Sequence, residues 1–406
     1  MRCRHCNTSL THTFIDLGFS PPSNAYLTAA QLEQPEQYFP LKVKVCDNCW
    51  LVQTEDYAEA DNLFSSDYAY FSSTSTTWLA HAAEYSQMIQ QKLSLNHHSN
   101  VVEIAANDGY LLKNFVAVGI DCLGIEPTAS TAKIAEKLGV PIIQEFFSQR
   151  LAQQLLAQRK AADLIIGNNV YAHVPDINDF TRGLKTLLAA NGTITLEFPH
   201  LLHLISECQF DTIYHEHFSY LSLHVVNRIF SQHGLQIYAV EQLTTHGGSL
   251  RIYGCHTGAK QSETSVQEVL RQEQDHGLLN LTTYESFQPR ANLIKYDLLR
   301  FLLDCKRDNK KVGAYGAAAK GNTLLNVAGI KSDLLPFVVD AASSKQGHYL
   351  PGSHIPIFPP DYLHTIHLDY ILILPWNLAS EIKRNLAVIN KGNTKFVTFI
   401  PKLIIN

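Results

Sequence analysis

Four cysteines in two short pairs constrain the fold of the first fifty residues more than any other feature. Cys3 and Cys6 form one Cys-x-x-Cys pair, Cys46 and Cys49 form another, and the remaining four of the eight cysteines are scattered singly. Each pair can hold two thiolates on one tight turn, and two such turns supply the tetrahedral four-sulfur shell that zinc prefers. We therefore expect a structural zinc site, because four protein ligands leave no position for water or substrate.

Redox-active dithiols are the main alternative for these cysteines, since the loop between the pairs is longer than in most zinc ribbons. Disulfides are disfavoured because the start of the chain, Met1-Arg-Cys-Arg-His-Cys, has no apolar segment like that of a secretory signal. His5 lies inside the first pair, but a shell of four cysteines does not need it. Bound zinc would fold a segment that has too few apolar residues to fold alone.

Composition and charge limit the class of protein. The chain has 406 residues, 46% hydrophobic and 17% charged, which suits two or three globular domains. Its net charge of −5 lacks the cationic excess of a protein that binds nucleic-acid backbones. No stretch approaches the ~18 to 20 continuous apolar residues needed to cross a bilayer. We expect a cytoplasmic protein without nucleic-acid or membrane partners, present as a monomer or weak dimer.

A βαβ pattern begins near residue 100. An apolar strand enters the turn at residues 103–109, a helix follows, a second strand ends in Glu126, and residues 141–143 give a third strand. An acid at the end of the second strand can accept hydrogen bonds from the ribose of an adenosine cofactor. The turn lacks G-x-G-x-x-G and carries acids that would repel a pyrophosphate. A cationic sulfonium cofactor with an amino-acid tail therefore fits better.

The turn Glu-Ile-Ala-Ala-Asn-Asp-Gly resembles the first motif of S-adenosylmethionine (SAM)-dependent methyltransferases, although Ala105 stands where that motif usually has glycine. An aromatic pair past the third strand could pack on the adenine, and the strand at residues 163–169 would end beneath the cofactor. Any one of these residues alone could be merely structural. The residues expected to bind the cofactor are Glu103, Asn107, Asp108, Gly109, Glu126, Phe146, Asn168 and Asn169.

The segment Tyr214-His215-Glu216-His217 is part of the densest polar stretch of the chain. Metal binding is one interpretation, but the spacing lacks the i, i+4 histidines of a zinc helix. A surface turn with accidental histidines is another. Acid/base chemistry is favoured, because imidazole titrates near neutrality and a neighbouring carboxylate can orient it.

The whole chain resembles the three-domain nucleotide-sugar C-methyltransferases, which methylate a ring carbon beside a keto group. The cysteine pairs, the motifs above, Asn-Asn-Val-Tyr-Ala-His-Val-Pro-Asp, Glu-Phe-Pro-His, Gly-Gly-Ser-Leu-Arg and Gly-Ala-Ala-Ala-Lys-Gly-Asn occur in that family's order. The resemblance implies that His217 is the general base, with Tyr214, Glu216, His173 and Tyr68 in the same active site. On the residues alone, each tyrosine would be assigned to the core or its rim.

A strand, a glycine turn and a helix near residues 311–326 open a third part of the chain. This turn is neither a Walker A loop nor a dinucleotide fingerprint, but backbone N–H groups and Lys320 suit a diphosphate. The alternative is a lid without ligand contacts. The resemblance implies that this part helps hold the nucleotide sugar. The residues expected to contact substrate are Glu197, His200, Ser249, Arg251, Lys320 and Asn322.

The expected architecture is α/β throughout, with three parts. Residues 1–70 would form the zinc-binding module, residues 71–245 a Rossmann-like SAM-methyltransferase domain, and residues 246–406 a Rossmann-like nucleotide-sugar-binding domain. The resemblance implies C-methylation of a 4-keto nucleotide-diphosphate deoxysugar at C3, with SAM and structural zinc as cofactors. The alternatives are methylation of a sugar oxygen or nitrogen, and a non-enzymatic zinc-bearing binding protein.

Overall fold

The computed structural model describes residues 1–55, 71–158, 160–386 and 394–406. The N-terminal part is a four-stranded antiparallel sheet in the order β1-β2-β3-β9. Three of its strands come from the first 54 residues, β1 (His12–Ser20), β2 (Phe39–Val45) and β3 (Val52–Thr54). The fourth, β9 (Ser219–Tyr220), is separated from the Tyr-His-Glu-His segment by Phe218 alone. The N-terminal sheet is thus completed by a strand from the middle of the chain.

The central part is a seven-stranded sheet in the order β10-β11-β8-β7-β4-β5-β6, in which only β11 runs against its neighbours. Its strands are β4 (Asn100–Ile104), β5 (Asp121–Ile125), β6 (Ile142–Ile143), β7 (Ala162–Asn168), β8 (Leu188–Pro199), β10 (Leu235–Leu243) and β11 (Ser249–His256). The strand order reverses between β4 and β7. In open α/β sheets, ligands bind beyond the carboxyl ends of the strands at such a reversal.

Helices cover both faces of this sheet, because each carries an apolar stripe. Buried residues of α5 (Gln149–Gln158), α6 (Ile177–Leu187), α8 (Leu223–Gln232) and α9 (Thr264–Asp275) pack on one face. Those of α2 (Thr76–Leu93), α3 (Lys113–Val116) and α4 (Ala129–Lys137) pack on the other. The short α7 (Leu201–Ser206) follows β8. This three-layer arrangement is the Rossmann-like fold that the βαβ pattern predicts.

The C-terminal part is a second doubly wound sheet, in the order β14-β13-β12-β15-β16-β17, with only β17 antiparallel. Its strands are β12 (Val312–Tyr315), β13 (Val338–Val339), β14 (Ile357–Phe358), β15 (Tyr370–Ile373), β16 (Lys395–Thr398) and β17 (Ile404–Ile405). Its helices are α10 (Leu281–Glu285), α11 (Phe287–Arg307), α12 (Ala319–Ala328) and α13 (Ala379–Leu386).

Pro289 lies in the first turn of α11, just after the short break at Ser286 that separates α10 from α11. A proline is tolerated there because its missing N–H would have no partner within the helix. Another break in the helical stretch lies earlier, where Gly277 adopts φ +77° after α9.

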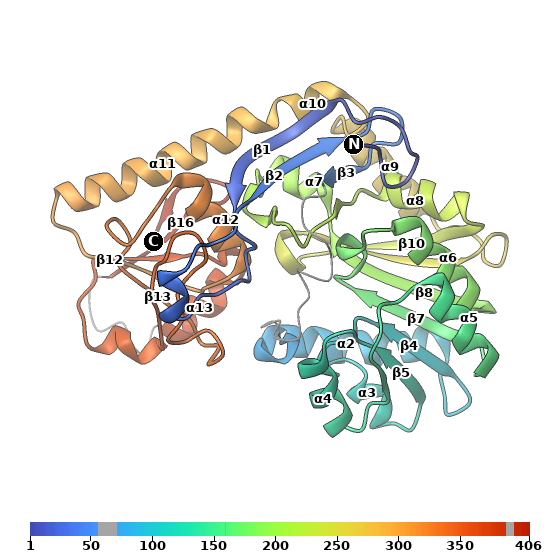
Figure 1. Ribbon diagram of the computed structural model, residues 1–406. Coiled ribbons are helices and arrows are strands. Elements are labelled where there is room, and N and C mark those ends of the chain that lie inside the picture. The colour runs from blue at the N-terminus through green and yellow to red at the C-terminus, as the bar shows by residue number, and fades with distance from the viewer. Residues whose placement is uncertain (56–70, 159, 387–393) are drawn as a thin grey trace.

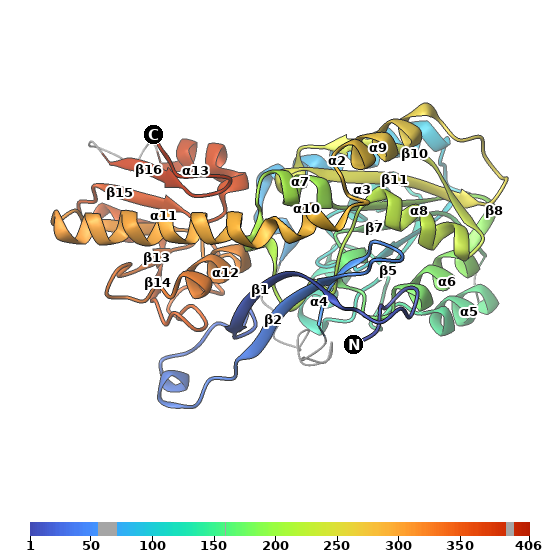
Figure 2. The same cartoon turned by 90° about the horizontal axis from the view of Figure 1, so that it is seen from above.

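The N-terminal and C-terminal parts share one hydrophobic core. Phe14 of β1 stacks on Phe287 of α11 with 4.4 Å between ring centroids, and the same cluster includes Leu41, Phe210 and Leu324. Helix α11 runs past the N-terminal strands and along the C-terminal sheet, and the two α/β parts lie on either side of β1 and β2 (Figures 1 and 2). The boundary expected at 245/246 falls between β10 and β11, which are hydrogen-bonded neighbours in the central sheet.

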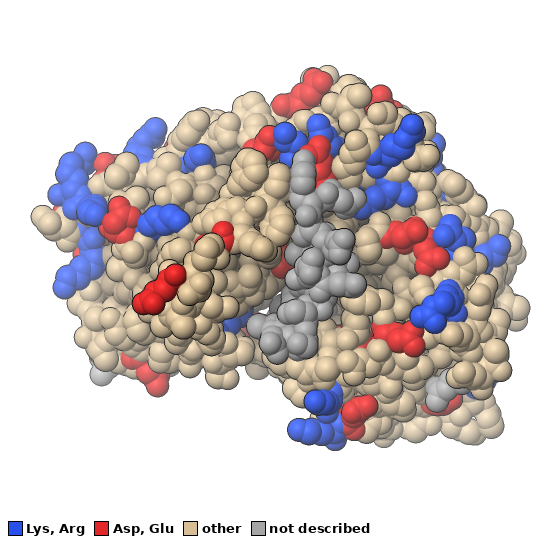
Figure 3. Space-filling view, in the orientation of Figure 1, with Lys and Arg blue, Asp and Glu red and all other residues tan. Residues whose placement is uncertain are grey.

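The surface carries both signs of charge. Lysines, arginines, aspartates and glutamates are interspersed on the face shown in Figure 3, and the surface is hollowed between the C-terminal part and the central domain. In the part of the chain that the structure describes, no helix is both long and apolar enough to span a membrane.

Candidate active site and metal centre

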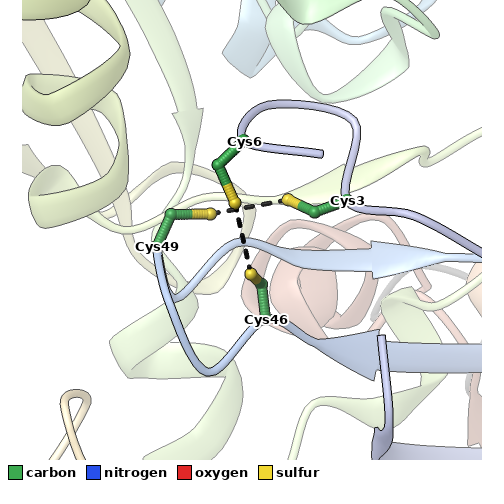
Figure 4. Close-up of side chains that lie close together, drawn as sticks. All are labelled: Cys3, Cys6, Cys46 and Cys49. Atoms are coloured by element: carbon green, nitrogen blue, oxygen red, sulfur yellow. Dashed lines mark hydrogen bonds between the residues drawn. The ribbon is translucent and has the colours of Figure 1, made fainter. Parts of the chain in front are cut away.

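The four N-terminal cysteines point toward one centre (Figure 4). Their sulfur atoms all lie within 4.8 Å of one another, and the Cys3–Cys49 and Cys6–Cys46 Sγ–Sγ distances are both 3.5 Å. A tetrahedral zinc with Zn–S bonds of about 2.3 Å would place sulfurs about 3.8 Å apart. All four thiols are free, so the residues fit the predicted zinc site and form no disulfide.

The surroundings of the four sulfurs also suit a metal. The buried amide of Gln53 donates from Nε2 to Cys3 Sγ at 3.3 Å, as outer-shell groups do around bound metals. Thr8 Oγ1 lies 3.2 Å from Cys6 Sγ. His5 takes no part, because its Nδ1 lies 2.9 Å from Asn178 Oδ1 on α6. The site has four sulfur ligands and no open position, which makes it structural.

The turn after β4 is built from residues in left-handed backbone conformation. Ala105, Asn107 and Gly109 have φ values of +58°, +49° and +77°. Glycine is required at position 109, since a Cβ there would lie 3.0 Å from the backbone of Ala135 in α4. The turn therefore brings the backbone of residues 105–109 close against α4, at the carboxyl end of β4, where the strand order reverses.

Several buried polar atoms around this turn have no partner within the described residues. They are both carboxylate oxygens of Glu103, Oδ1 of Asp108, and both side-chain amide atoms of Asn168 at the end of β7. Burial, followed by the charges of Glu126 and Asp108, raises the pKa of Glu103 well above its usual range. Buried polar groups normally have partners, so these atoms mark a place for a ligand with several hydrogen-bonding groups.

Other predicted cofactor residues have partners within the protein. Glu126 accepts hydrogen bonds from the backbone N–H groups of Asn107 and Thr128, both at 2.9 Å. The side chains of Asn107 and Asp108 accept from the backbone of Ser72 and Ser73, before α2. These contacts hold the Glu126 carboxylate in place, and its contact with a ribose hydroxyl stays a prediction.

Phe146 lies after β6 and is 47% exposed, so its ring surface is accessible for stacking. Asn169 follows β7 in left-handed conformation, with φ +53°. Its backbone N–H donates to the Glu197 carbonyl at 2.7 Å, which holds the ends of β7 and β8 together. The roles of Phe146 and Asn169 toward the cofactor remain predictions.

His217 is buried, and one of its ring nitrogens has a defined partner. Nδ1 lies 2.9 Å from the Thr212 carbonyl, an acceptor, so Nδ1 carries the proton and Nε2 carries the lone pair. Thr54 of the N-terminal sheet donates to the His217 carbonyl at 3.1 Å. Burial, followed by the charge of His173, lowers the pKa of His217 well below its usual range. The imidazole is therefore neutral at pH 7.

Two further predicted residues pack against this imidazole. The rings of Tyr214 and His173 have centroids 4.0 Å and 4.6 Å from that of His217. His173, at the end of the 3-10 helix η3 (Tyr171–His173), donates from Nδ1 to the Glu216 carbonyl at 2.7 Å. Burial lowers the pKa of His173 to about 4. The structure thus brings these side chains together, whereas Tyr68 lies outside the described residues.

His246 is a site residue that the sequence analysis missed. It lies in η5 (Thr245–Gly247) with φ +53°, and its Nε2 accepts a hydrogen bond from Asn169 Nδ2 at 3.0 Å. Burial, then the charge of Lys320, lowers its pKa to about 4. His246 therefore connects the end of β7 to the His217 side of the site. A left-handed non-glycine residue before two glycines has no sequence signature that would have revealed it.

Two predicted substrate residues pair with each other. Arg251 Nη2 donates to Glu197 Oε2 at 2.9 Å, and His81 Nε2 lies 2.9 Å from the same oxygen. Burial acts to raise the pKa of Glu197, but His81 and Arg251 outweigh it and the pKa is lowered. Ser249 donates to the Thr245 carbonyl at 2.9 Å. Glu197 also accepts from Thr245 Oγ1 at 2.9 Å, so Glu197 and Ser249 support η5 directly. The contact of all three predicted residues with substrate remains a prediction.

His200 has an enclosed partner of its own. Its Nε2 lies 2.7 Å from Glu273 Oε1, and both side chains are almost fully buried. Glu273 also accepts from the backbone N–H groups of Leu223 and His224, so this pair ties β8 and α9 to the start of α8. In this structure, the His200 side chain contributes to packing of the central domain, and its role toward substrate is untested.

Lys320 lies at the start of α12, where the C-terminal part meets the central part. Its Nζ donates to Asn377 Oδ1 at 2.7 Å and lies 4.8 Å from the centre of the Trp376 ring. Burial lowers the pKa of Lys320, and Asp211 opposes that shift. Trp376 in turn donates from Nε1 to Asp211 Oδ2 at 2.7 Å. Neither Asp211 nor Trp376 had been singled out from the sequence.

Comparison with known families assigns each of these three parts. The family model "Putative zinc binding domain" matches residues 3–64, "Methyltransferase domain" matches residues 77–240, and "C-methyltransferase C-terminal domain" matches residues 244–401. C-methyltransferase NovU from Streptomyces niveus is 32% identical over 401 residues, which is 98% of this chain and 95% of that protein. The chain belongs to this family of SAM-dependent C-methyltransferases.

Solved structures resemble part of this C-methyltransferase at low sequence identity. The PH0226 protein from Pyrococcus horikoshii OT3 has a TM-score of 0.39 and 13% identity, covering 50% of this chain and 100% of that one. A SAM-dependent methyltransferase from Clostridium acetobutylicum ATCC 824 has a TM-score of 0.37 and 10% identity, covering 44% and 92%. Each likeness covers half of this chain or less.

The structure of the C-methyltransferase fits both cofactors of its family. SAM carries an ammonium, a carboxylate and ribose hydroxyls, which suit the unpartnered carboxyl oxygens of Glu103, Oδ1 of Asp108 and the amide of Asn168. The four sulfurs fit zinc. The enzyme therefore uses SAM as its methyl donor and zinc as a structural element, as the motifs predicted.

Proposed function

We propose that this C-methyltransferase acts on a 4-keto nucleotide-diphosphate deoxysugar and methylates C3, the ring carbon beside the ketone. The observation that carries the proposal is the state of His217. Its proton is held on Nδ1 by the Thr212 carbonyl, its pKa is depressed by burial, and Nε2 keeps a lone pair at neutral pH. A buried neutral imidazole is what removal of a proton from carbon requires.

A C–H bond becomes acidic beside a carbonyl, because the charge left on carbon spreads onto oxygen as an enolate. In the proposed reaction, Nε2 of His217 takes the proton and the C–H electron pair moves toward the ketone oxygen. Donors near that oxygen would stabilise the charge, and the Tyr214 hydroxyl, whose ring packs against that of the base, is the candidate donor. His173 also packs against the base, but its Nδ1–H is already donated to the Glu216 carbonyl. When bound, SAM supplies an electrophilic methyl group for the carbon.

The nucleotide would extend toward the C-terminal part. Lys320 is a buried cation at the first turn of α12, where backbone N–H groups also favour anions. Its present partner is the neutral amide of Asn377, so a diphosphate would offer a stronger, charge-assisted contact. The buried Oδ1 of Asn322 has no partner within the described residues and could accept a donor from the same ligand.

The test is to incubate the enzyme with SAM carrying a 13C-labelled methyl and a panel of 4-keto nucleotide deoxysugars, and to locate the label by NMR. We expect label on the ring carbon at C3. Label on C5 would show that the methylated carbon is C5 and not C3. Label on a sugar oxygen or nitrogen would show that the enzyme does not methylate carbon in this substrate class. Bound SAM without turnover of any sugar in the panel would contradict the proposed substrate class.

A further inference from the structure

Glu216 has two carboxyl oxygens in very different surroundings. The side chain is 1% exposed, in the turn between Tyr214 and His217. Oε1 accepts a hydrogen bond from the side-chain amide of Asn24 at 3.1 Å. Oε2 is buried and has no partner among the residues that the structure describes. A buried oxygen without a partner is costly, by about 1–3 kcal/mol, so Oε2 is a place where a ligand group would be stabilised.

Asn24 belongs to the N-terminal module, in the loop between β1 and β2, and the C-terminal part holds this loop on both sides of it. Asn322 of α12 donates to the Ser23 carbonyl at 2.6 Å. The Tyr26 hydroxyl donates to the Ala317 carbonyl, which precedes α12. The amide of Asn24 is therefore presented to Glu216 by two anchored neighbours, and all three parts of the enzyme meet at this carboxyl group.

We propose that Asn24 is a positioning residue for catalysis, which fixes the Glu216 carboxyl through Oε1 and leaves Oε2 to bind a polar group of the substrate. This inference rests on the proposed function, because it assigns Oε2 to the substrate of that reaction. It gives the N-terminal module a direct part in the active site, beyond holding zinc.

The hydrogen bond from Asn24 to Glu216 also affects the pKa of Glu216, and this effect does not depend on any substrate. Burial raises the pKa of Glu216, and the hydrogen bond from Asn24 acts in the opposite direction, because a donated N–H favours the ionised carboxylate. The charge of Glu216 also acts to raise the pKa of the Tyr26 and Tyr220 hydroxyls. Removing the Asn24 amide should therefore raise the pKa of Glu216 further.

Three variants of the full-length, zinc-loaded enzyme test the inference. Asn24→Ala removes the donor, and Asn24→Asp keeps the shape but replaces the donor with an acid. Gln31→Ala is the matched control, since Gln31 is an exposed amide of the same loop that bonds only locally to Thr28. Melting temperature, zinc content and SAM affinity should match the wild type in all three, which separates positioning from folding.

The first readout is the Glu216 carboxyl pKa from 13C NMR of glutamate-labelled protein, assigned with Glu216→Gln. We expect both Asn24 variants to raise it and Gln31→Ala to leave it unchanged. An unchanged Glu216 pKa in both Asn24 variants would show that Asn24 does not donate a hydrogen bond to Glu216. This readout needs no sugar, so it stands or falls separately from the proposed reaction.

The second readout is a double-mutant cycle on kcat, with the sugar that the labelling experiment identifies. Asn24→Ala should lower kcat about tenfold, as expected for loss of a hydrogen bond to an ionised group, and should have little further effect in the Glu216→Gln background. Equal effects in both backgrounds would mean that Asn24 does not act through Glu216. If the wild type methylates no sugar, the proposed function fails while the pKa result still decides the contact.

Discussion

The imidazole of His217 is the residue on which the proposed chemistry depends, and His217→Asn tests it. Asparagine keeps a side chain that can donate to the Thr212 carbonyl but has no basic nitrogen. We expect kcat to fall by about 10²- to 10⁴-fold, the usual contribution of a positioned base, while SAM affinity is retained. Steady-state kinetics and calorimetry would measure the two. His276→Asn, on an exposed helix end, is the control, and a His217 variant with most of its kcat would rule out this base.

The pH profile gives an independent check on the same residue. The pKa of His217 is lowered well below 6.5 by burial and by His173. The base form is therefore complete at neutral pH and is lost only as pH falls through that lowered value. If His217 is the base, its titration should leave the wild-type kcat/KM level from pH 8 to 6.5 and lower it at more acidic pH. A decline centred at or above 6.5 would contradict the assignment.

Single residues show how far a sequence can predict a site. The cysteine pairs and the turn before Gly109 were predictable because their ligands or their backbone requirements are local in the sequence. Arg251 and Glu197 were predicted to contact substrate, but their mutual ion pair was not predicted, since β8 and β11 become neighbours only in the folded sheet. His246 and Asn24 were missed for the same reason, because each acts through a partner at least 77 residues away.

At the scale of elements, the turn after β4 carries backbone strain at the residue where the sequence departs from the methyltransferase motif. Ala105 replaces the glycine of the methyltransferase motif, and the structure gives it φ +58°. An L-residue in this conformation lowers the stability of the fold by roughly 1–2 kcal/mol. Glycine avoids this strain but lowers stability by about 0.4–1 kcal/mol, because it gives the unfolded chain more conformational entropy. Ala105→Gly should therefore raise the free energy of unfolding by between about 0 and 1.6 kcal/mol.

The control for that substitution is Ala83→Gly, at an exposed position within α2, which should destabilise by about 1 kcal/mol because glycine is a poor helix residue. Denaturant unfolding of the two variants measures both values. If Ala105→Gly were as destabilising as Ala83→Gly, the left-handed conformation of residue 105 would be wrong.

Strands of the two doubly wound sheets were predictable from their apolar runs, and the sheets follow from alternating strands and helices. Strand β9 was not predictable. It has only two residues, and it completes the N-terminal sheet by pairing with β3. Nothing local in the sequence distinguishes Ser219–Tyr220 from the polar segment before it. Its consequence is functional, since this pairing fixes the chain just after His217 to the zinc module.

At the scale of the whole molecule, zinc and the active site are therefore linked. The backbone N–H of Thr54 donates to the Phe218 carbonyl at 3.2 Å and its hydroxyl donates to the His217 carbonyl, while β3 follows the second cysteine pair.

We expect Cys46→Ser to lower zinc content and folding yield, and to reduce the free energy of unfolding by several kcal/mol, because zinc binding contributes directly to folding. Elemental analysis and thermal unfolding measure these effects, with Cys305→Ser as a matched buried thiol outside the metal site. Stoichiometric chelation should act in the same way on the wild type and lower kcat as the support beneath His217 loosens. A Cys46 variant that folds normally without zinc would show that the four sulfurs do not hold a structural metal.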